Sequence, residues 1–327
     1  MKRFLFILPL LIILVHAGCE NTENDGIDFD QLSSLYIEGL TFNNYPKIDG
    51  STSNLPLSTV IACTLFGIEY RWAQEWGNLQ RIVPNLNKND TSKFLDLLGS
   101  SQTHQSFINL INKDADIILS ARKMSPDEKA IADAAGINLI ETPIALDGFL
   151  FVVYPGNQIE SLTTGQIQDI YTGKITDWAE VGGDDVSIQP YVRNANSGSQ
   201  ELMETLVMKD LDIPWFPESY DELLVVIGGM VPVYETVSYD YRSICYSLYY
   251  YKEYMITEID VKTIAINGIL PNKETISNYT YPYVAEVYAV IRSDLDKSSM
   301  AYKLYLWLQT EKGKQTINDS GYIPYYE

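Results

Sequence analysis

The sequence predicts an α/β protein. Short apolar runs alternate along the chain with longer segments whose apolar residues recur at helical spacing, and this alternation is typical of α/β folds. With 327 residues, the chain is long enough for two domains of ordinary size. We therefore expect helices packed around a largely buried sheet.

The first half of the chain carries clear start and stop signals. Ser125 and Pro126 predict a helix start, because serine caps the first turn and proline is tolerated at the first helical position. Gly136 predicts the end of that helix. The other predicted elements are strands over residues 45–48, 115–119 and 137–142 and helices over residues 57–66, 91–98 and 105–112.

The second half opens with a continuously apolar segment, residues 148–154, which predicts a strand buried between two domains. The tyrosine-rich segment 246–254 predicts an amphipathic helix whose rings pack in the core. Residues 223–227 fit a helix or a strand. The remaining predictions are helices over residues 163–171 and 298–309 and strands over residues 188–192, 261–266 and 285–291.

Residues 1–18 predict a signal peptide. Lys2 and Arg3 precede an apolar run that is too short to span a membrane comfortably and that ends in Ala17-Gly18-Cys19. Small residues before a cysteine resemble a bacterial lipobox, which implies cleavage after Gly18 and a lipid on Cys19. His16 departs from the usual leucine, and a transmembrane anchor or a plain secretory signal is the alternative. The polar, acidic residues 19–29 predict a tether.

The chain is strongly acidic. Its formal net charge is −20 at pH 7, whereas a protein that binds nucleic acid needs a basic footprint. The composition therefore favours a soluble extracytoplasmic protein without nucleic-acid partners. Cys63 and Cys245 predict two buried thiols, with a disulfide between them as the alternative in an oxidising compartment.

One loop before a helical pattern, residues 193–199, combines a fixed cation, two hydroxyls and a glycine. A helix start offers unpaired backbone N–H groups and the positive end of the helix dipole. Arg193 adds a planar fork of donors, which matches a tetrahedral oxyanion. Gly198 lets the backbone approach a ligand, and Ser199 caps the helix next to Ser197. The loop predicts an anion cradle; a capped helix with a surface arginine is the alternative.

Three further clusters have a similar form. Asp49-Gly50-Ser51-Thr52-Ser53 follows a predicted strand and precedes a predicted helix, and hydroxyls suit a partly protonated anion because they both donate and accept. Thr103-His104 precedes another helix, and Ser120-Ala121-Arg122 ends a strand, where ligands bind in open α/β sheets. From these clusters the candidate ligand-binding residues are Ser51, Thr52, Ser53, Thr103, His104, Ser120 and Arg122.

These clusters, in this order, resemble the phosphate-binding protein of bacterial ABC phosphate importers. Residues 49–53 look like the first Gly/Ser/Thr loop of that family. Residues 193–199 match its Arg-x-x-x-Ser-Gly-Thr loop with serine in place of threonine. The most specific match is the segment LTTGQIQDIYTGKITDW at residues 162–178 with Val181-Gly182-Gly183. The resemblance runs from about residue 45 to the C-terminus.

The resemblance implies a two-lobe, periplasmic-binding-protein-like fold of type II, with hinge strands. Lobe one would comprise residues 30–147 plus 260–327, and lobe two residues 148–259. The lobes would close on inorganic phosphate or a related oxyanion and deliver it to an ABC permease, with the protein a lipid-anchored monomer. The resemblance implies no enzymatic activity and no cofactor. The chain has two histidines, one of them in the signal peptide, which disfavours a histidine metal site.

The chain also departs from the family pattern. Some relatives carry an aspartate, which accepts a proton from phosphate, where this chain has Arg122. We expect Asp147, at the start of the hinge strand, to act as the acceptor instead. The alternatives are another oxyanion (tungstate, molybdate or sulfate) and a surface-anchored sensor or adhesion protein that keeps the fold.

Overall fold

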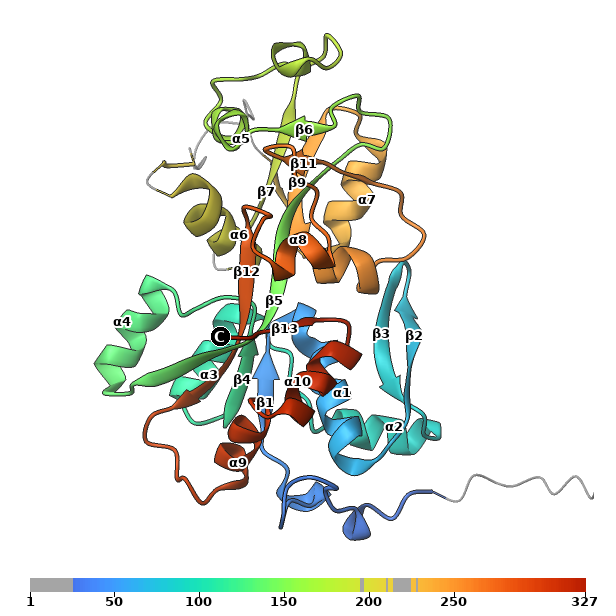
Figure 1. Cartoon of the computed structure of the whole chain (residues 1–327), viewed down its shortest axis with the longest axis vertical. Helices are drawn as coiled ribbons and strands as arrows, with labels where there is room; N and C mark the ends of the chain where they lie inside the picture. Colours follow the sequence, from blue (N-terminus) through green and yellow to red (C-terminus); the bar gives the residue numbers. More distant parts are fainter. Residues whose placement is uncertain (1–25, 195–196, 210, 214–224, 228) are drawn as a thin grey trace, which may run out of the picture.

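A mixed sheet organises the molecule (Figure 1). The computed structural model describes residues 26–194, 197–209, 211–213, 225–227 and 229–327. Within them, nine strands form one sheet in the order β1-β4-β12-β5-β9-β7-β8, with β10 and β13 also paired to β5. These strands are β1 Ile48–Gly50, β4 Ile117–Ser120, β5 Leu139–Val153, β7 Gln189–Arg193, β8 Val225–Ile227, β9 Ser243–Leu248, β10 Lys262–Thr263, β12 Val284–Arg292 and β13 Ile323–Pro324.

Strand β5 links the two halves of the sheet. Its residues 139–148 pair antiparallel with β12, and its last five residues, 149–153, pair antiparallel with β9. On one side of β5, β12 pairs with β4, which pairs with β1. On the other side, β9 pairs with β7, which pairs with β8. The change of partner falls at Gly148, so this point of β5 lies between two groups of strands.

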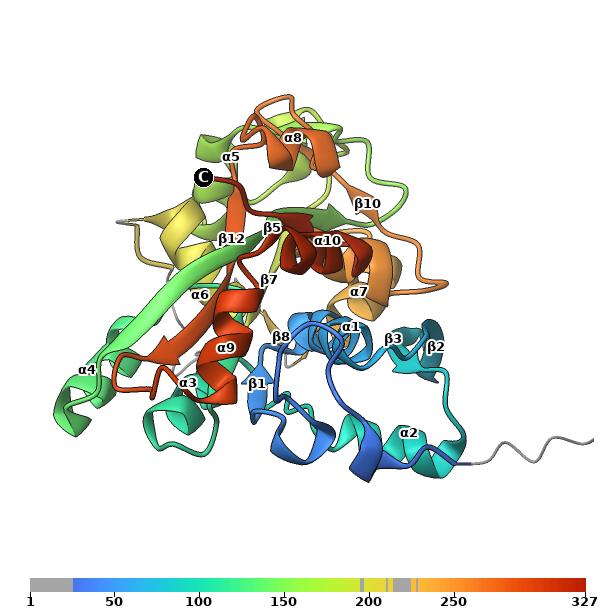
Figure 2. The same cartoon turned by 60° about the horizontal axis from the view of Figure 1, so that its bottom comes forward.

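The helices gather around the two groups of strands (Figures 1 and 2). Around β1 and β4 lie α1 Leu55–Phe66, α2 Lys88–Leu95, α3 Thr103–Ile111, α4 Pro126–Ala135, α9 Met300–Trp307 and α10 Glu311–Asp319. Around β7 and β9 lie α5 Thr164–Tyr171, α6 Gly198–Leu202, α7 Val231–Tyr239 and α8 Lys273–Ser277, together with the small pair β6 Ser161–Leu162 and β11 Ala265–Ile266. The predicted α/β class is confirmed.

Local signals placed several elements correctly. Ser125 caps α4 through a hydrogen bond from the Glu128 N–H to its Oγ at 3.3 Å, and Gly136 ends the helix with φ +67°. The prediction for residues 246–254 is wrong over its first residues: β9 runs to Leu248, and a π-helical turn, Tyr251–Met255, follows. The hairpin of β2 Tyr70–Trp76 and β3 Leu79–Pro84 was not predicted.

Both cysteines within the described residues are buried free thiols, Cys63 and Cys245, and burial raises the pKa of each to about 12. The described part of the chain contains no helix with both the length and the apolar character to cross a bilayer. The predicted signal peptide, Cys19 and most of the tether fall in residues 1–25, outside the described residues.

Candidate functional site

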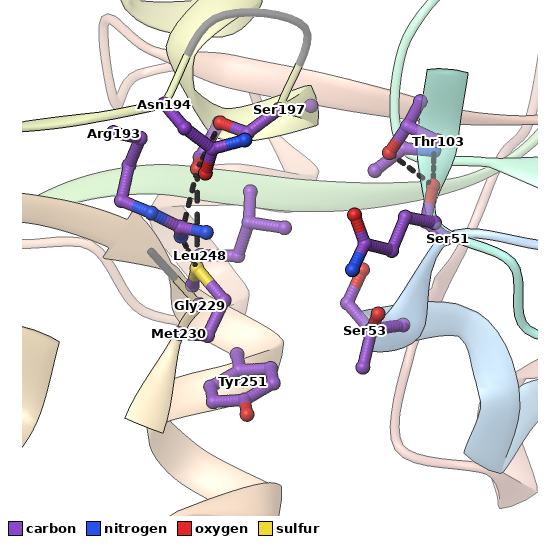
Figure 3. Close-up of a pocket in the computed structure, with 15 residues that line it drawn as sticks. Ser51, Ser53, Thr103, Arg193, Asn194, Ser197, Gly229, Met230, Leu248 and Tyr251 are labelled. Atoms are coloured by element: carbon purple, nitrogen blue, oxygen red, sulfur yellow. Dashed lines mark hydrogen bonds between the residues drawn. The ribbon is translucent and has the colours of Figure 1, made fainter. Parts of the chain in front are cut away.

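A cavity of about 550 Å³ opens between the two groups of strands, and most of the predicted ligand-binding loops meet there (Figure 3). One wall carries Ser51, Ser53 and Thr103, and the other carries Arg193, Asn194 and Ser197. The described residues that line the cavity are Ser51, Thr52, Ser53, Gln102, Thr103, Ala121, Arg193, Asn194, Ser197, Gly198, Ser199, Gly229, Met230, Leu248 and Tyr251.

The first wall begins at the end of β1. Gly50 is needed there, because a Cβ at this position would lie 2.3 Å from the carbonyl oxygen of Leu119 on the paired strand β4. The same carbonyl oxygen of Leu119 also holds the next residue, because it accepts a hydrogen bond from the Ser51 N–H at 3.0 Å. The Ser51 Oγ lies 2.9 Å from the Thr103 Oγ1 and accepts a hydrogen bond from the Ala121 N–H at 3.2 Å. The close pairing of β1 with β4 therefore brings three of the predicted clusters together.

Asp49 holds two loops of this wall in place. Its Oδ1 accepts from the N–H groups of Gly50 at 2.7 Å and Ser101 at 2.8 Å. Its Oδ2 accepts from the Ser101 Oγ at 2.5 Å and from the Asn109 amide at 2.7 Å. This buried carboxylate is engaged by four donors, so its role is to position the loops that carry Ser51 and Thr103.

The second wall begins at Arg193, the last residue of β7, which is 5% exposed. Its backbone N–H donates to the Tyr246 hydroxyl at 2.9 Å, and its Nη1 donates to the Ser199 Oγ at 3.2 Å. Burial lowers the pKa of the Arg193 guanidinium below its usual value, and a poorly hydrated guanidinium is well suited to an anionic partner.

The start of α6 completes this wall. The helix cap is Ser197, whose Oγ accepts from the Gln200 N–H at 3.1 Å; the prediction that Ser199 caps the helix is therefore wrong. Ser199 instead contacts Arg193. At Gly198 the two walls meet, because a Cβ there would lie 2.5 Å from the Thr103 Oγ1. The absence of a side chain at Gly198 lets the walls approach.

Three predicted residues do not line the cavity because they belong to a neighbouring ion-pair cluster. Arg122 forms a two-point pair with the fully buried Glu128, at 2.7 and 2.8 Å, and His104 Nδ1 lies 3.0 Å from the same carboxylate. Burial alone would raise the pKa of Glu128, but the hydrogen bonds and charge of Arg122 lower it overall. Ser120 donates its hydroxyl to the Arg122 carbonyl at 2.6 Å. These residues support the first wall from behind.

Asp147 is also absent from the cavity lining. It is buried in β5, where its Oδ1 accepts from the N–H groups of Gly148 at 2.8 Å and Tyr250 at 2.9 Å. Its Oδ2 has no hydrogen-bond partner within the described residues. Burial raises its pKa to about 7, although the two backbone hydrogen bonds act in the opposite direction. The structure therefore places Asp147 at the change of partner in β5 and not in the lining of the cavity.

Several lining residues were not predicted. Tyr251, Met230 and Leu248 form an apolar part of the second wall and reach it through long-range strand pairing, for which the sequence carried no local signal. Gln102, which directly precedes the predicted Thr103, also lines the cavity and was not predicted. Its backbone has φ +70° and ψ +166°, a region that is essentially confined to glycine, and holding a glutamine there costs about 1–3 kcal/mol.

The described residues include no group of three or more His, Cys, Asp or Glu side chains that could hold a metal ion. The lining instead combines one guanidinium, hydroxyls, amides and the N-terminal ends of two helices. This set can bind a small anion through many hydrogen bonds.

Comparisons with known proteins agree with this description. The phosphate-binding protein PstS of Pseudomonas aeruginosa is 26% identical over 304 residues, which cover 86% of this chain and 85% of that protein. PstS of Borreliella burgdorferi is 25% identical over 247 residues, which cover 75% of this chain and 85% of that protein. The predicted resemblance to such proteins is confirmed.

Solved structures share the fold. A substrate-binding protein with bound phosphate from Clostridium perfringens gives a TM-score of 0.61 at 21% identity, over 85% of this chain and 98% of that chain. An ABC-type phosphate transport receptor from Vibrio cholerae gives a TM-score of 0.58 at 21% identity, over 84% of this chain and 98% of that chain. The predicted two-lobe architecture is thereby confirmed. A family model, the PBP superfamily domain, matches residues 88–308, and the chain therefore belongs to the PBP superfamily.

Proposed function

We propose that this protein captures inorganic phosphate between two lobes and delivers it to an ABC permease. The observation that carries the proposal is the cavity itself, where Arg193 on one wall faces the hydroxyl-rich loop of Ser51 on the other. The relatives named above are phosphate-binding proteins, which favours phosphate over other oxyanions.

The chemistry of the lining suits a tetrahedral oxyanion. Arg193 supplies a charged, planar pair of donors, and the hydroxyls of Ser51, Thr52, Ser53, Thr103, Ser197 and Ser199 can donate to phosphate oxygens or accept a phosphate proton. Backbone N–H groups at the starts of α3 and α6 add further donors. The formal net charge of −20 does not oppose this, because a narrow cavity responds to nearby dipoles and charges more than to the net charge.

The proposed lobes are residues 30–147 plus 260–327 and residues 148–259. In support, β5 exchanges β12 for β9 next to Gly148, at the proposed boundary. The cavity walls come from opposite sides of this boundary and touch at Gly198 and Thr103. Rotation of one lobe relative to the other, about the point next to Gly148 where β5 changes its partner, would then open and close the site.

We further propose that Cys19 carries a lipid that anchors a monomeric protein to a bacterial membrane on the extracytoplasmic side, at the periplasmic face or the cell surface. The support is the sequence of residues 1–19, a basic start and an apolar run that ends in Ala-Gly-Cys. Mass spectrometry of the membrane-bound protein should find a diacylated N-terminal cysteine, and Cys19→Ala should release the protein or leave the signal uncleaved. An unmodified Cys19 in the membrane fraction would contradict the lipid anchor.

The test of phosphate capture is calorimetric titration of the purified protein and of Arg193→Ala. The wild type should bind one phosphate, and removing a charged hydrogen-bond donor should weaken binding by roughly 10- to 100-fold. The matched control is Arg71→Ala, because Arg71 is an exposed arginine on β2 whose side chain hydrogen-bonds only to Asn85 among the described residues. An absence of phosphate binding by the wild type would overturn the proposal, and equal affinities for the wild type and Arg193→Ala would remove Arg193 from the site.

A further inference from the structure

Gln102 presents a neutral amide to the proposed phosphate site. It lines the cavity and directly precedes Thr103 in the chain. Arg193 and Asn194 lie on the wall opposite Thr103 (Figure 3). The side chain is exposed, and no described residue hydrogen-bonds to its amide. The amide is therefore available to a ligand in the cavity, as both a donor and an acceptor.

The neighbours of Gln102 hold it in place. On one side, Ser101 is bound twice by the carboxylate of Asp49, through its N–H at 2.8 Å and its Oγ at 2.5 Å. On the other side, the Gln102 carbonyl accepts from the Ser106 N–H at 3.0 Å, which begins the hydrogen bonding of α3. A glutamine with φ +70° and ψ +166° persists only where such anchors over-determine the backbone.

The described lining of the cavity contains no carboxylate. Asp49 behind the first wall is occupied by four donors, and Asp147 lies outside the cavity. A carboxylate in the cavity would accept a hydrogen bond from a protonated ligand oxygen and would repel an oxyanion that carries no proton. An amide has no charge, and by exchanging its oxygen for its nitrogen it can face either a protonated or an unprotonated ligand oxygen.

We propose that Gln102 is a specificity-determining residue of this site and makes it permissive toward tetrahedral oxyanions that carry no proton. This inference rests on the proposed phosphate function. A neutral hydrogen bond changes affinity by roughly tenfold or less, whereas sites that leave a buried polar group unpaired reject the wrong ligand by about 10⁴-fold. Sulfate, which is fully ionised near neutral pH, should therefore bind this protein less than about 100-fold more weakly than phosphate.

The experiment is calorimetric titration of the purified protein with phosphate and with sulfate at pH 7.5. Gln102→Glu places a carboxylate in the cavity, so it should raise the preference for phosphate over sulfate by about 30-fold or more. Gln102→Ala removes the amide without adding charge and should weaken both ligands by about 2- to 10-fold, with little change in their ratio. The matched control is Gln105→Glu, which adds the same charge about one turn along α3, at an exposed position outside the cavity.

A wild-type preference for phosphate of 100-fold or more would overturn the inference, because it would require an acceptor that the amide does not provide. An unchanged ratio in Gln102→Glu would also overturn it, whether or not Gln105→Glu behaves in the same way. These failures differ from failure of the proposed function, in which the wild type would bind no phosphate at all.

Discussion

Gln102 combines an unfavourable backbone conformation with a place in the cavity lining. Glycine adopts φ +70° and ψ +166° without a steric penalty, so Gln102→Gly should raise the free energy of unfolding by about 1 kcal/mol, after allowance for the entropy of glycine. The same change removes the amide and should weaken phosphate binding. Thermal unfolding and calorimetry on one preparation check both effects. A variant that is less stable than the wild type would show that the side chain stabilises the fold and does not strain it.

Asp147 should act on stability rather than on ligand choice. Burial raises its pKa from 3.8 to about 7, so the folded protein holds the proton over a range in which the unfolded chain has lost it. The stability contribution of the protonated form is complete below about pH 4 and is lost as the pH rises through 7, by an amount on the order of 4 kcal/mol.

Asp147→Asn mimics the protonated carboxyl and should remove this pH dependence. The difference in melting temperature between Asp147→Asn and the wild type should therefore be larger at pH 8 than at pH 4. Phosphate affinity should stay within about threefold of the wild type, since Asp147 does not line the cavity. A large loss of phosphate affinity would instead restore Asp147 as a ligand acceptor.

The segments that carry the site differ in how well the sequence predicts them. The loops at Ser51 and Arg193 were predicted because glycine and hydroxyl residues before a helix are a local signal. The role of Arg122 was not predicted, because the local sequence shows a cation but does not show which side chain forms an ion pair with it. Its partner, Glu128, is the third residue of the helix capped by Ser125, and the Ser-Pro-Asp-Glu pattern could have indicated that this glutamate turns back toward the chain before α4.

Strand β5 shows a second limit. The sequence predicted two strands, 137–142 and 148–154, and Pro143 lies in the gap between them. The structure contains one continuous strand, β5. Its pairing with β12 continues past Pro143, with a shift of register beside that residue. Proline, which lacks an N–H, is accommodated at such an irregularity. The missed β2–β3 hairpin did carry a signal: Gly77-Asn78 is a typical two-residue hairpin loop.

The contact between α6 and α3 should govern how closely the walls approach. The Cβ of any side chain at position 198 would lie 2.5 Å from the Thr103 Oγ1, which is too close for two non-bonded atoms. Gly198→Val should therefore hold the walls apart and weaken phosphate binding by 10-fold or more, with the fold retained. The double variant Gly198→Val/Thr103→Ala has room for the added side chain and should recover part of the affinity. No recovery would indicate that Gly198 acts through its own backbone N–H.

On the scale of the two proposed lobes, phosphate should favour the closed arrangement, because only there can one ligand touch Arg193 and Ser51 together. Small-angle X-ray scattering should show a smaller radius of gyration with saturating phosphate than without it. Gly198→Val with saturating phosphate should stay at the larger value. Identical scattering curves for the free and the saturated wild type would argue against hinge closure.

The C-terminal segment completes the first wall. The Tyr322 hydroxyl lies 3.0 Å from the Ser53 carbonyl oxygen and 2.8 Å from the Asn54 Oδ1, and it can donate its one proton to either of them. Its ring stacks on Tyr250, with 3.8 Å between the ring centroids. Tyr250 immediately precedes the π-helical turn that carries Tyr251 into the cavity. A ribosome makes the chain from its N-terminus, so the loop of Ser53 is made long before Tyr322 is added. That loop therefore lacks this support until residue 322 has been made, so a chain cut short before residue 322 should bind phosphate more weakly than the full chain.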